Sequence, residues 1–531
     1  MKLLHPGYPM PEKRVLLICP PFPKTFWSMS RTLQLTGRRA LTPPLGLLTV
    51  AALLPPQWQV RLADLNVRPL TPDDWQWADL VMLSGMFVQK ESLLGLAREA
   101  KERQKTVVAG GPYPTSFPQE VMEAGVDLVA CGEAEMTMAP LVATINGGQS
   151  RGVIEADGWA DMTLSPVPRY ALLNFQDYEA MSLQTTRGCP FKCEFCHVAR
   201  LYGHKPRYKT PAQVVKELDN LYLQGWRRVV FICDDNFIAH RQAAQDILRE
   251  MILWLEDRGE PLSFWAQTSL NLGSDLEMID LMTAANFSDV FIGIESPDRE
   301  LLAQTGKFQN LGHPIVQSLK NIRANGLTVM GSFIIGFDGE EKGAGRRISD
   351  LVAETDIPMV MINILTAVPG TALWDRLQQE GRLLPHLDVG EFHGQVMNFR
   401  PHRPESEIRG EWREAIDFLY EPSSFLKRTY RYILGTRPTR RTLAQAKGVI
   451  LPPVGKRSRP LRTDSLRDGW NFLKLIWRQG VAAEYRGQFW KQLWGVYRHN
   501  PSRLLRYINL LFLGENLFEI REQELSERKK S

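Results

Sequence analysis

The sequence predicts an α/β protein with a doubly wound parallel sheet first, a partial or full α/β barrel second, and a helical, basic C-terminal region last. Short apolar strands alternate with helical stretches over residues 14–146, and the same rhythm returns after residue 180. From about residue 400 the pattern becomes helical and rich in Lys and Arg. Because 531 residues are too many for one compact domain, we expect three domains, over 10–150, 180–395 and 396–531.

The first series of strands ends in loops that contain glycine. Its strand candidates are VLLI (15–18), VRLADL (60–65), LVMLSG (80–85), TVVAGG (106–111) and LVACG (128–132). Ligands of doubly wound sheets bind at the carboxyl ends of strands, where glycine lets a backbone approach closely. These loops are therefore a candidate ligand site, although such a fold needs turns there in any case. The loop residues concerned are Ser84, Gly85, Gly110, Gly111, Pro112, Gly132 and Glu133.

The second series predicts six strand–helix units. Its strand candidates are LQTTRG (183–188), RVVFICD (228–234), SFWAQTS (263–269), DVFIGIE (289–295), TVMGSFIIGF (328–337) and MVMINIL (359–365). Helical stretches such as PAQVVKELDNLYLQG (211–225) separate them. Six such units favour a partial or full α/β barrel, whose active site lies at the carboxyl ends of the strands.

Composition and the chain start limit where the protein works. A content of 44% hydrophobic and 23% charged residues is typical of a globular protein. The start, MKLLHPGYPMPEKR, lacks the apolar stretch of a signal peptide, and no apolar run approaches the roughly 18 residues of a membrane span. We expect a cytoplasmic protein that is free or attached only to the surface of a membrane.

Three of the six cysteines lie within eight residues. Cys189, Cys193 and Cys196 have the spacing CxxxCxxC in RGCPFKCEFCHVARLYG, just after the first predicted barrel strand. Three close thiolates can hold a 4Fe–4S cluster with one iron left open, and an open iron can chelate the amino and carboxylate groups of S-adenosylmethionine (SAM). The alternative is a structural zinc site with His197 as fourth ligand, although zinc knuckles usually show CxxC. Buried thiols are the interpretation for the other cysteines, Cys19, Cys131 and Cys233.

The CxxxCxFC motif after a first barrel strand resembles that of the radical SAM superfamily. GSFIIGFDGE (331–340) is similar to the family's GxIxGxxxE segment, and VFIGIES ends where the fourth strand often places a polar SAM contact. The second strand ends in CDDN, where the family often has a GGE-type motif. The resemblance implies a 4Fe–4S cluster on the three cysteines and names no catalytic residue. The SAM contacts that it implies are Phe195, Asp234, Glu295, Gly331, Gly336 and Glu340.

The N-terminal sheet resembles the cobalamin-binding domain that is fused to many radical SAM enzymes. The similar segments are TPPLGLLTVAALLP, VRLADLNV, GGPYPT and CGEAE, and the glycine-bearing loops are then the implied cobalamin contacts. No histidine lies between residues 6 and 196, so the DxHxxG motif that supplies a lower cobalt ligand in other cobalamin proteins is missing. Either cobalt is bound without a histidine of this domain, as in many relatives, or the domain has lost cobalamin.

The motifs together resemble a cobalamin-dependent radical SAM group that includes the hopanoid C-2 methylases. The resemblance implies a methylase that abstracts hydrogen from an unactivated carbon with a 5′-deoxyadenosyl radical and takes the methyl group from cobalamin. A hopanoid-type lipid is the candidate substrate, and a reductase or flavodoxin-type protein is the expected electron donor. His197-Val198 stands where Asp-Ile is expected, so the substrate could differ. The alternatives are a cyclisation or rearrangement enzyme without net methyl transfer and a non-catalytic cobalamin or iron–sulfur sensor.

The C-terminal region carries the basic charge of the chain. Residues 425–531 hold 23 Lys/Arg and 8 Asp/Glu, against 41 and 51 in the rest. Apolar residues recur there every three or four positions and indicate one helical face. They are Leu466, Trp470, Leu473, Trp477, Val481, Tyr485, Phe489, Leu493, Trp494 and Tyr497, with Lys474, Arg478, Arg486, Lys491 and Arg498 between them. Such a face can pack on the barrel, lie on an anionic membrane or bind nucleic acid. No RNA-binding module is visible, and we expect no nucleic-acid partner.

Overall fold

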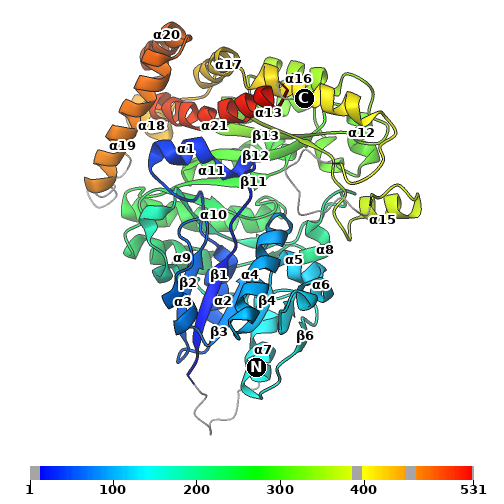
Figure 1. Cartoon of the computed structure of the whole chain (residues 1–531). Helices are drawn as coiled ribbons and strands as arrows, with labels where there is room; N and C mark the ends of the chain where they lie inside the picture. Colours follow the sequence, from blue (N-terminus) through cyan, green and yellow to red (C-terminus); the bar gives the residue numbers. More distant parts are fainter. Residues whose placement is uncertain (1–11, 385–396, 450, 452–461, 529–531) are drawn as a thin grey trace. The chain divides into compact units, whose positions relative to one another are not determined.

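The protein divides into two compact units. The computed structural model describes residues 12–384, 397–449, 451 and 462–528. One unit, called here the N-terminal unit, comprises Met1–Pro23 and Pro44–Asn174; the other, the barrel unit, comprises Lys24–Pro43 and Phe175–Ser531 (Figure 1). The segment from residue 24 to 43 and the C-terminal helices therefore belong to the same unit as the barrel.

The N-terminal unit is built on a six-stranded, fully parallel sheet. Its strands are β1 (Arg14–Cys19), β2 (Gln59–Asp64), β3 (Leu80–Ser84), β4 (Thr106–Gly110), β5 (Leu128–Cys131) and β6 (Gly152–Glu155). Their order, β2-β1-β3-β4-β5-β6, is that of a doubly wound fold, as predicted. Five of the strands were predicted. β6 was missed because it is a four-residue edge strand without a fully buried residue, so it carries no apolar signal.

Helices cover both faces of this sheet. They are α2 (Leu45–Leu53), α3 (Pro72–Trp77), α4 (Lys90–Glu102), α5 (Pro112–Ser116), α6 (Pro118–Glu123) and α7 (Ala134–Asn146). In β1 every residue after Arg14 is buried, with Leu16 and Ile18 in one core and Val15 and Leu17 in the other. Burial on both faces explains why the strand is a continuous apolar run.

The barrel unit contains the second six-stranded parallel sheet. Its strands are β7 (Ala180–Leu183), β10 (Val229–Ile232), β11 (Ser263–Thr268), β12 (Phe287–Glu295), β13 (Thr328–Ile335) and β14 (Met359–Ile364). β14 and β7 are the two edges and do not pair, so the barrel is partial. All six predicted strands are present. The first is split, because its second half forms the antiparallel hairpin of β8 (Thr186–Arg187) and β9 (Arg207–Tyr208).

The helices of the barrel unit before residue 400 mostly alternate with its strands. They are α1 (Ser30–Thr36), α8 (Val198–Tyr202), α9 (Pro211–Leu223), α10 (Arg241–Arg258), α11 (Leu276–Ala284), α12 (Arg299–Gln304), α13 (Ile315–Ala324), α14 (Ala344–Thr355) and α15 (Ala372–Gln379). The predicted helix at 211–225 is α9, which starts where the sequence places a capping box between Thr210 and Gln213 and a proline at the first position.

The C-terminal helices complete the barrel unit. They are α16 (Glu405–Leu419), α17 (Pro422–Leu434), α18 (Arg440–Ala446), α19 (Arg462–Leu475), α20 (Arg486–His499) and α21 (Leu504–Arg528). A π-helical turn, Ile476–Ala482, follows α19. The early helix α1 packs against α19 and α21, so chain segments far apart in sequence lie side by side (Figure 1). Within the described ranges, none of the helices combines the length and the apolarity needed to cross a membrane.

Helix α16 covers the open edge of the barrel. An edge strand leaves backbone groups unpaired, and proteins protect such an edge by covering it. The indole of Trp412 donates to the carbonyl of Ile362 at 2.8 Å, and the hydroxyl of Tyr420 donates to that of Val360 at 2.7 Å. Both carbonyls belong to β14. Trp412 of α16 and Tyr420 at its C-terminal end therefore satisfy two edge carbonyls of β14 that have no neighbouring strand.

Candidate functional site

The three clustered cysteines lie in the long loop that connects β8 to β9. Gly188 starts this loop with φ +91°, and a Cβ there would lie within about 3 Å of three backbone carbonyl oxygens, those of Tyr202, Gly203 and Lys205. The amide of Cys189 donates to the Gly203 carbonyl at 3.2 Å. Only glycine suits this position, so the entry of the loop is fixed by the backbone.

The three cysteines of this loop are half-buried. Burial raises the pKa of Cys189, and it raises that of Cys196 to about 12. Binding of iron would displace these protons, because only the thiolate is a ligand. The amide of Gln309 lies 3.5 Å from the sulfur of Cys193, where it can donate to a bound thiolate. The loop therefore fits a cluster held by three cysteines.

The mononuclear zinc alternative fits the loop less well. A tetrahedral zinc with bonds of about 2.3 Å would hold its sulfurs within about 4 Å of one another. Among the described residues, the three cysteines do not form a group whose ligand atoms all lie within 4.8 Å. Burial lowers the pKa of His197 to about 4, so its imidazole is neutral, and the spacing of the three sulfurs is what disfavours zinc.

A buried ion pair faces the cysteine loop. The ammonium of Lys307 lies 2.8 Å from Oε1 of Glu295, and both side chains are buried. Burial alone would lower the pKa of Lys307. The attraction of its ammonium to Glu295, and next to Cys193, is larger than this effect, so the pKa is raised and the residue stays cationic. Lys307 was not predicted, because it lies more than 100 residues beyond the cysteines and no local pattern marks it.

Backbone geometry holds Glu295 in this place. A register shift in the pairing of β12 with β13 lies between Gly293 and Glu295, and Glu295 has φ +67°. A Cβ on Gly293 would lie 2.2 Å from the Glu295 carboxylate, so glycine is required beside it. A non-glycine residue at positive φ is uncommon and is typical of functional sites. Glu295 was predicted as a SAM contact; its carboxylate is already bound to Lys307, and contact with SAM stays a prediction.

The predicted adenine neighbour Phe195 packs beside this pair. Its ring centre lies 5.6 Å from that of Phe337 and 5.9 Å from the ammonium of Lys307. Gly306, with φ +72°, places its missing Cβ 2.7 Å from the carbonyl of Lys192. The turn that carries Lys307 is therefore pressed against the cysteine loop. Phe195 is positioned between the two, although its contact with SAM is untested.

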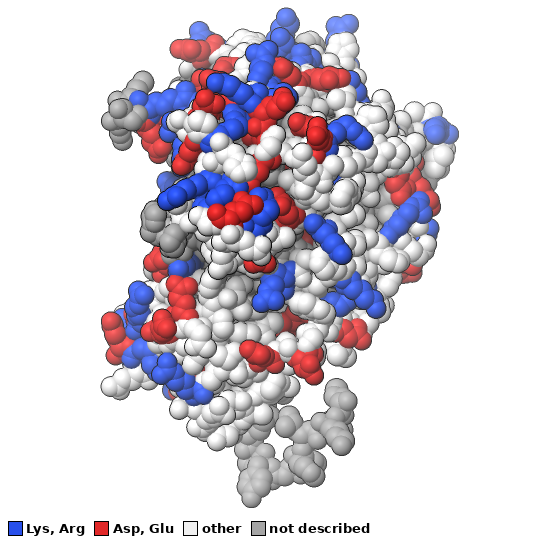
Figure 2. Space-filling model, turned by 90° about the vertical axis from the view of Figure 1, so that its right-hand side faces the viewer, with Lys and Arg blue, Asp and Glu red and all other residues white. Residues whose placement is uncertain are grey.

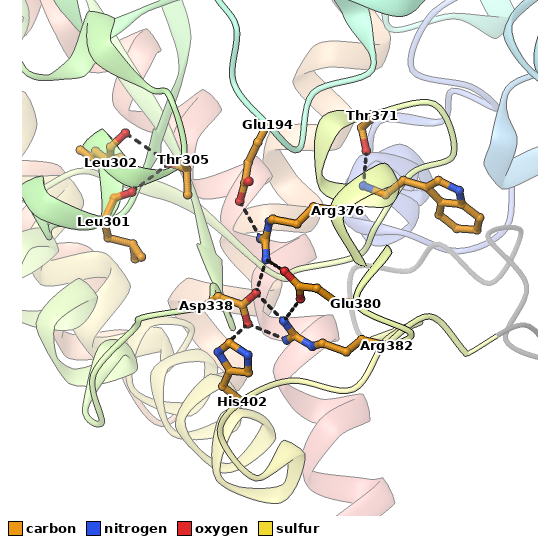
Figure 3. Close-up of polar contacts among 11 residues, drawn as sticks. Glu194, Leu301, Leu302, Thr305, Asp338, Thr371, Arg376, Glu380, Arg382 and His402 are labelled. Atoms are coloured by element: carbon orange, nitrogen blue, oxygen red, sulfur yellow. Dashed lines mark hydrogen bonds and ion pairs between the residues drawn. The ribbon is translucent and has the colours of Figure 1, made fainter. Parts of the chain in front are cut away.

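Arginine side chains connect the cysteine loop to the end of β13. Arg376 lies 3.2 Å from Glu194, in the middle of the cysteine motif, and 2.7 Å from Asp338 (Figure 3). Arg382 makes two further contacts with Asp338, at 2.7 and 2.9 Å. These contacts keep the pKa of Asp338 low despite its burial. Because the acid already has two guanidinium partners, the nearby group of Asp338, Glu380 and His402 does not suit a metal ion.

The predicted SAM segment 331–340 forms the end of β13 and a tight turn. Gly331 is buried within the sheet, opposite Ile292 of β12. Gly336 has φ +103°, and its amide donates to the carboxylate of Glu340 at 2.7 Å. Burial raises the pKa of Glu340 to about 7. Glu340 thus fixes the turn that presents Phe337, and its direct contact with SAM stays a prediction.

The two acids that follow β10 differ in what they can do. Asp234 is fully buried, and its carboxylate accepts the amides of Thr185 and Thr186 at 2.6 and 3.0 Å and the hydroxyl of Thr185. Asp235 is half-buried, and its Oδ2 atom is buried without a hydrogen-bond partner among the described residues. Asp235 is also among the groups that raise the pKa of the Cys189 and Cys196 thiols.

An unpaired buried carboxylate needs a cation or donor, because burying it alone is costly. Asp235 is therefore a second candidate for contact with the amino group of SAM, and the contact predicted for Asp234 stays a prediction. Burial, and next the charge of Asp234, raise the pKa of Asp235 to about 7. Asp234 instead joins the end of β10 to the chain that leads into the cysteine loop.

The predicted cobalamin contacts gather at one edge of the sheet in the N-terminal unit. Ser84 and Gly85 end β3, Gly110, Gly111 and Pro112 follow in β4 and α5, and Gly132 and Glu133 follow β5. These three strands are neighbours in the sheet. The residues are therefore together, although their contact with cobalamin is untested.

Two of these glycines are required by the loops themselves. Gly111 and Gly132 have φ +92° and +107°, and a Cβ on them would lie 2.6 Å from the Ser84 hydroxyl and from the Ala156 side chain, respectively. The Glu133 carboxylate is buried and accepts the amide of Ala160 at 2.7 Å. Glycine at these positions lets neighbouring loops pack closely. The glycine-bearing loop ends are therefore explained by the fold itself, whether or not they contact cobalamin.

Comparisons with known families agree with this architecture. The B12 binding domain model matches residues 35–142, the Radical SAM superfamily model matches 183–351, and a domain of unknown function, DUF4070, matches 371–530. An uncharacterised methyltransferase of Synechocystis sp. is 42% identical over 97% of this chain and 94% of its own length. The hopanoid C-2 methylase of Rhodopseudomonas palustris is 34% identical over 90% of this chain and 88% of its own.

The fold is also that of a solved cobalamin enzyme. The structure of the cobalamin-dependent SAM radical enzyme OxsB, with aqua-cobalamin and SAM bound, matches with a TM-score of 0.59 over 98% of this chain and 81% of that one, at 15% identity. The chain belongs to the radical SAM superfamily. Within it, the chain is a member of the cobalamin-dependent radical SAM methyltransferases.

This membership settles several alternatives. The cofactors are a 4Fe–4S cluster, SAM and cobalamin, so the zinc interpretation of the cysteine motif is wrong. The protein is an enzyme rather than a non-catalytic sensor. The missing histidine had raised a second possibility, that the domain has lost cobalamin. This possibility is excluded as well, because cobalamin is a cofactor of the family.

The cobalt should be held without a protein histidine. No histidine lies between residues 6 and 196. Electron paramagnetic resonance of the Co(II) protein reports nitrogen on the axial position. We expect identical spectra from protein grown with ¹⁴N- and ¹⁵N-histidine. A splitting that changes with the isotope would reveal a protein imidazole on cobalt and contradict this prediction.

Proposed function

We propose that this enzyme methylates an unactivated carbon of a polycyclic isoprenoid lipid of the hopanoid type. The observation that carries the proposal is an aromatic lining inside the barrel. Phe231, Trp265 and Phe291 are half-buried members of β10, β11 and β12, whereas their neighbours along each strand are fully buried beneath the helices. Because side chains alternate between the two faces of a strand, these three face the lumen.

The aromatic rings lie close enough to form one surface. The rings of Phe231 and Trp265 stack with centres 3.8 Å apart and planes 11° apart. Trp27, from the segment before α1, lies 5.2 Å from Phe291 and 6.3 Å from Trp265. Flat apolar walls suit a rigid hydrocarbon ring system and disfavour a charged substrate, which would lose its hydration there.

The amino end of the barrel is closed below these rings. Asp289 stands two residues before Phe291 on the same face of β12 and forms an ion pair with Arg506 of α21. Arg506 also donates to the hydroxyl of Thr328, at the start of β13, at 3.2 Å. A substrate would therefore meet the aromatic lining from the end of the barrel that carries the cysteine loop, where the chemistry of such barrels takes place.

The chemistry divides between the cofactors and this chain. When bound, the cluster with SAM supplies a hydrogen-abstracting 5′-deoxyadenosyl radical, and cobalamin supplies the methyl group. The chain holds the cysteine loop through Glu194 and Arg376 and offers the free Asp235 oxygen to SAM. Its aromatic lining excludes water from the reacting carbon.

The relatives support the reaction more firmly than the substrate. One is named a hopanoid C-2 methylase, whereas the more similar Synechocystis methyltransferase has no named substrate. The second candidate reaction for this enzyme is cyclisation or rearrangement without net methyl transfer. A reductase or flavodoxin-type electron donor is part of the proposal, since reductive cleavage of SAM needs one.

The test is expression in a host that makes unmethylated hopanoids, with methyl-labelled methionine in the medium. Mass spectrometry of the lipid extract should show one added labelled methyl group. The matched control is Cys196→Ala, which should leave the lipids unlabelled. The purified anaerobic enzyme should form 5′-deoxyadenosine and S-adenosylhomocysteine in about equal amounts per turnover, because SAM is used once for each role.

Each failure has its own meaning. Unchanged lipids together with continued formation of 5′-deoxyadenosine would contradict the hopanoid-type substrate and leave the radical chemistry in place. If 5′-deoxyadenosine formed with lipid extract but S-adenosylhomocysteine never did, the second candidate, rearrangement without methyl transfer, would replace methylation.

A further inference from the structure

A row of large apolar side chains lies exposed on the C-terminal helices. We call it the tryptophan face, and it consists of Leu466, Trp470, Leu473, Trp477 and Val481 on α19 and its π-helical turn, continued by Trp490, Trp494 and Tyr497 on α20. Trp470, Trp477 and Trp494 are 62, 65 and 63% exposed. The first five span about 22 Å of helix and expose roughly 600 Å², at the upper limit of the largest apolar patch on a typical monomer.

Buried contacts on the opposite side of the same helices hold the tryptophan face toward the solvent. Asn471 and Gln479 are buried; Asn471 donates to the carbonyl of Thr36 at 3.0 Å, and Gln479 donates to Glu515 at 2.8 Å. Leu475, Phe489 and Val496 are completely buried. Rotating α19 to hide its tryptophans would break buried hydrogen bonds and expose this packing, which is costly. The face is therefore a stable feature of the fold.

The charges around the face select an anionic partner. Over 466–500 the chain has six Lys/Arg and two Asp/Glu, and one of the acids, Asp468, pairs with Arg228 at 3.2 Å. Arg486, Lys491 and Arg498 are exposed and form no ion pair with any described residue. By contrast, the side of the molecule seen in Figure 2 carries basic and acidic side chains mixed together, without a large area of one charge.

We propose that the tryptophan face docks the enzyme on an anionic lipid surface. Tryptophan and tyrosine are enriched where a protein meets the headgroup level, and Lys/Arg beside them bind anionic lipid. A second copy of this chain is a poor occupant, since a symmetric interface would bring the same unpaired cations together. The proposal goes beyond the proposed substrate: it concerns where the enzyme sits, whatever lipid or other molecule it methylates.

The test is co-sedimentation of the full-length protein with vesicles. The protein should bind vesicles of phosphatidylcholine with 30% phosphatidylglycerol more tightly than pure phosphatidylcholine, and less tightly at 0.5 M NaCl, because salt screens exposed charges. Trp470→Ser/Trp477→Ser/Trp494→Ser should weaken binding at least tenfold, since binding scales with the apolar area inserted. Lys491→Glu/Arg498→Glu should remove the preference for the anionic lipid, because each basic residue contributes about fivefold.

The structure supplies a matched control and a choice of charges. Leu223→Ser/Leu253→Ser/Phe418→Ser removes three exposed apolar side chains from other helices and should bind as the wild type does. Lys474 and Arg478 are left unchanged, because they bond to the Leu35 carbonyl and to Glu515 within the fold. Circular dichroism and SAM cleavage in solution should be unchanged in every variant, which shows that each one is folded.

Two results would overturn the proposal. One is vesicle binding by the triple tryptophan variant that equals the wild type. The other is a wild-type dimer, measured by light scattering without vesicles, that the triple variant converts to a monomer, because the face would then be a protein interface. Neither result depends on the methylation substrate, so failure here is distinguishable from failure of the proposed function.

Discussion

Replacement of Cys189, Cys193 and Cys196 together by Ala is expected to remove the iron–sulfur cluster and all cleavage of SAM. Anaerobically reconstituted wild-type protein should hold about four irons per chain, and the variant close to none, because no other thiol lies in the cysteine loop. Formation of 5′-deoxyadenosine should fall below detection, a loss of at least a thousandfold. Iron analysis and product chromatography measure the two effects.

The other cysteines provide the control for this experiment. Cys19 is buried at the end of β1 in the N-terminal unit, and burial raises the pKa of its thiol. Cys19→Ala should leave the iron content unchanged. A triple variant that kept four irons would place the cluster elsewhere and contradict the assignment of the cysteine loop.

Replacement of Lys307 by Met should make the cluster harder to reduce. The ammonium is buried beside the cysteine loop and paired with Glu295. A unit charge at roughly 8 Å, in a medium of effective dielectric about 20, is equivalent to a shift on the order of 100 mV for a one-electron couple. Removing the cation should move the reduction potential to more negative values, which a redox titration followed by electron paramagnetic resonance measures. SAM cleavage should slow accordingly.

The partner residue gives a test of sign. Glu295→Gln keeps the cation and removes the anion, so it should move the potential in the opposite direction. Lys307→Met also leaves Glu295 buried without a partner, at a cost of about 3–5 kcal/mol of folding stability, and Glu295→Gln/Lys307→Met should recover part of that loss. Lys320→Met, which removes an exposed lysine of α13, is the matched control and should change neither quantity. Shifts of the same sign in both single variants would refute the electrostatic explanation.

The strands were predictable because their residues are buried on both faces. A buried parallel strand is a continuous apolar run, and RVLLIC and TVMGSFII are visible as such in the sequence. The cysteine spacing fixed the position of the cluster for a similar reason, since all its ligands lie in one short loop. Prediction succeeded where the information is local.

Features that depend on the three-dimensional fold could not be predicted from the sequence. Sequence cannot tell which of Asp234 and Asp235 faces the cysteine loop, because adjacent side chains point to opposite sides. It cannot bring Lys307 to the cysteines, which only the fold does. Periodicity predicted a single apolar helical face that includes Phe489, but the structure divides it, because Phe489 is buried whereas Trp477 and Trp494 are exposed. The π-helical turn adds residues per turn and shifts the pattern between α19 and α20.

The segment from residue 24 to 43 has a consequence for how the chain is made. The hydroxyl of Thr32 bonds to the carbonyl of Phe512, and the amide of Arg31 bonds to Glu519, across 480 and 488 residues of sequence. At synthesis rates of roughly 5–20 residues per second, α1 waits about half a minute or more for its partner helix to leave the ribosome. During that interval Trp27 and the apolar side of α1 need protection from aggregation. A barrel unit expressed from residue 175 alone would lack both Trp27 and α1. An expressed chain that includes them must begin before residue 24 and therefore also contains the N-terminal unit.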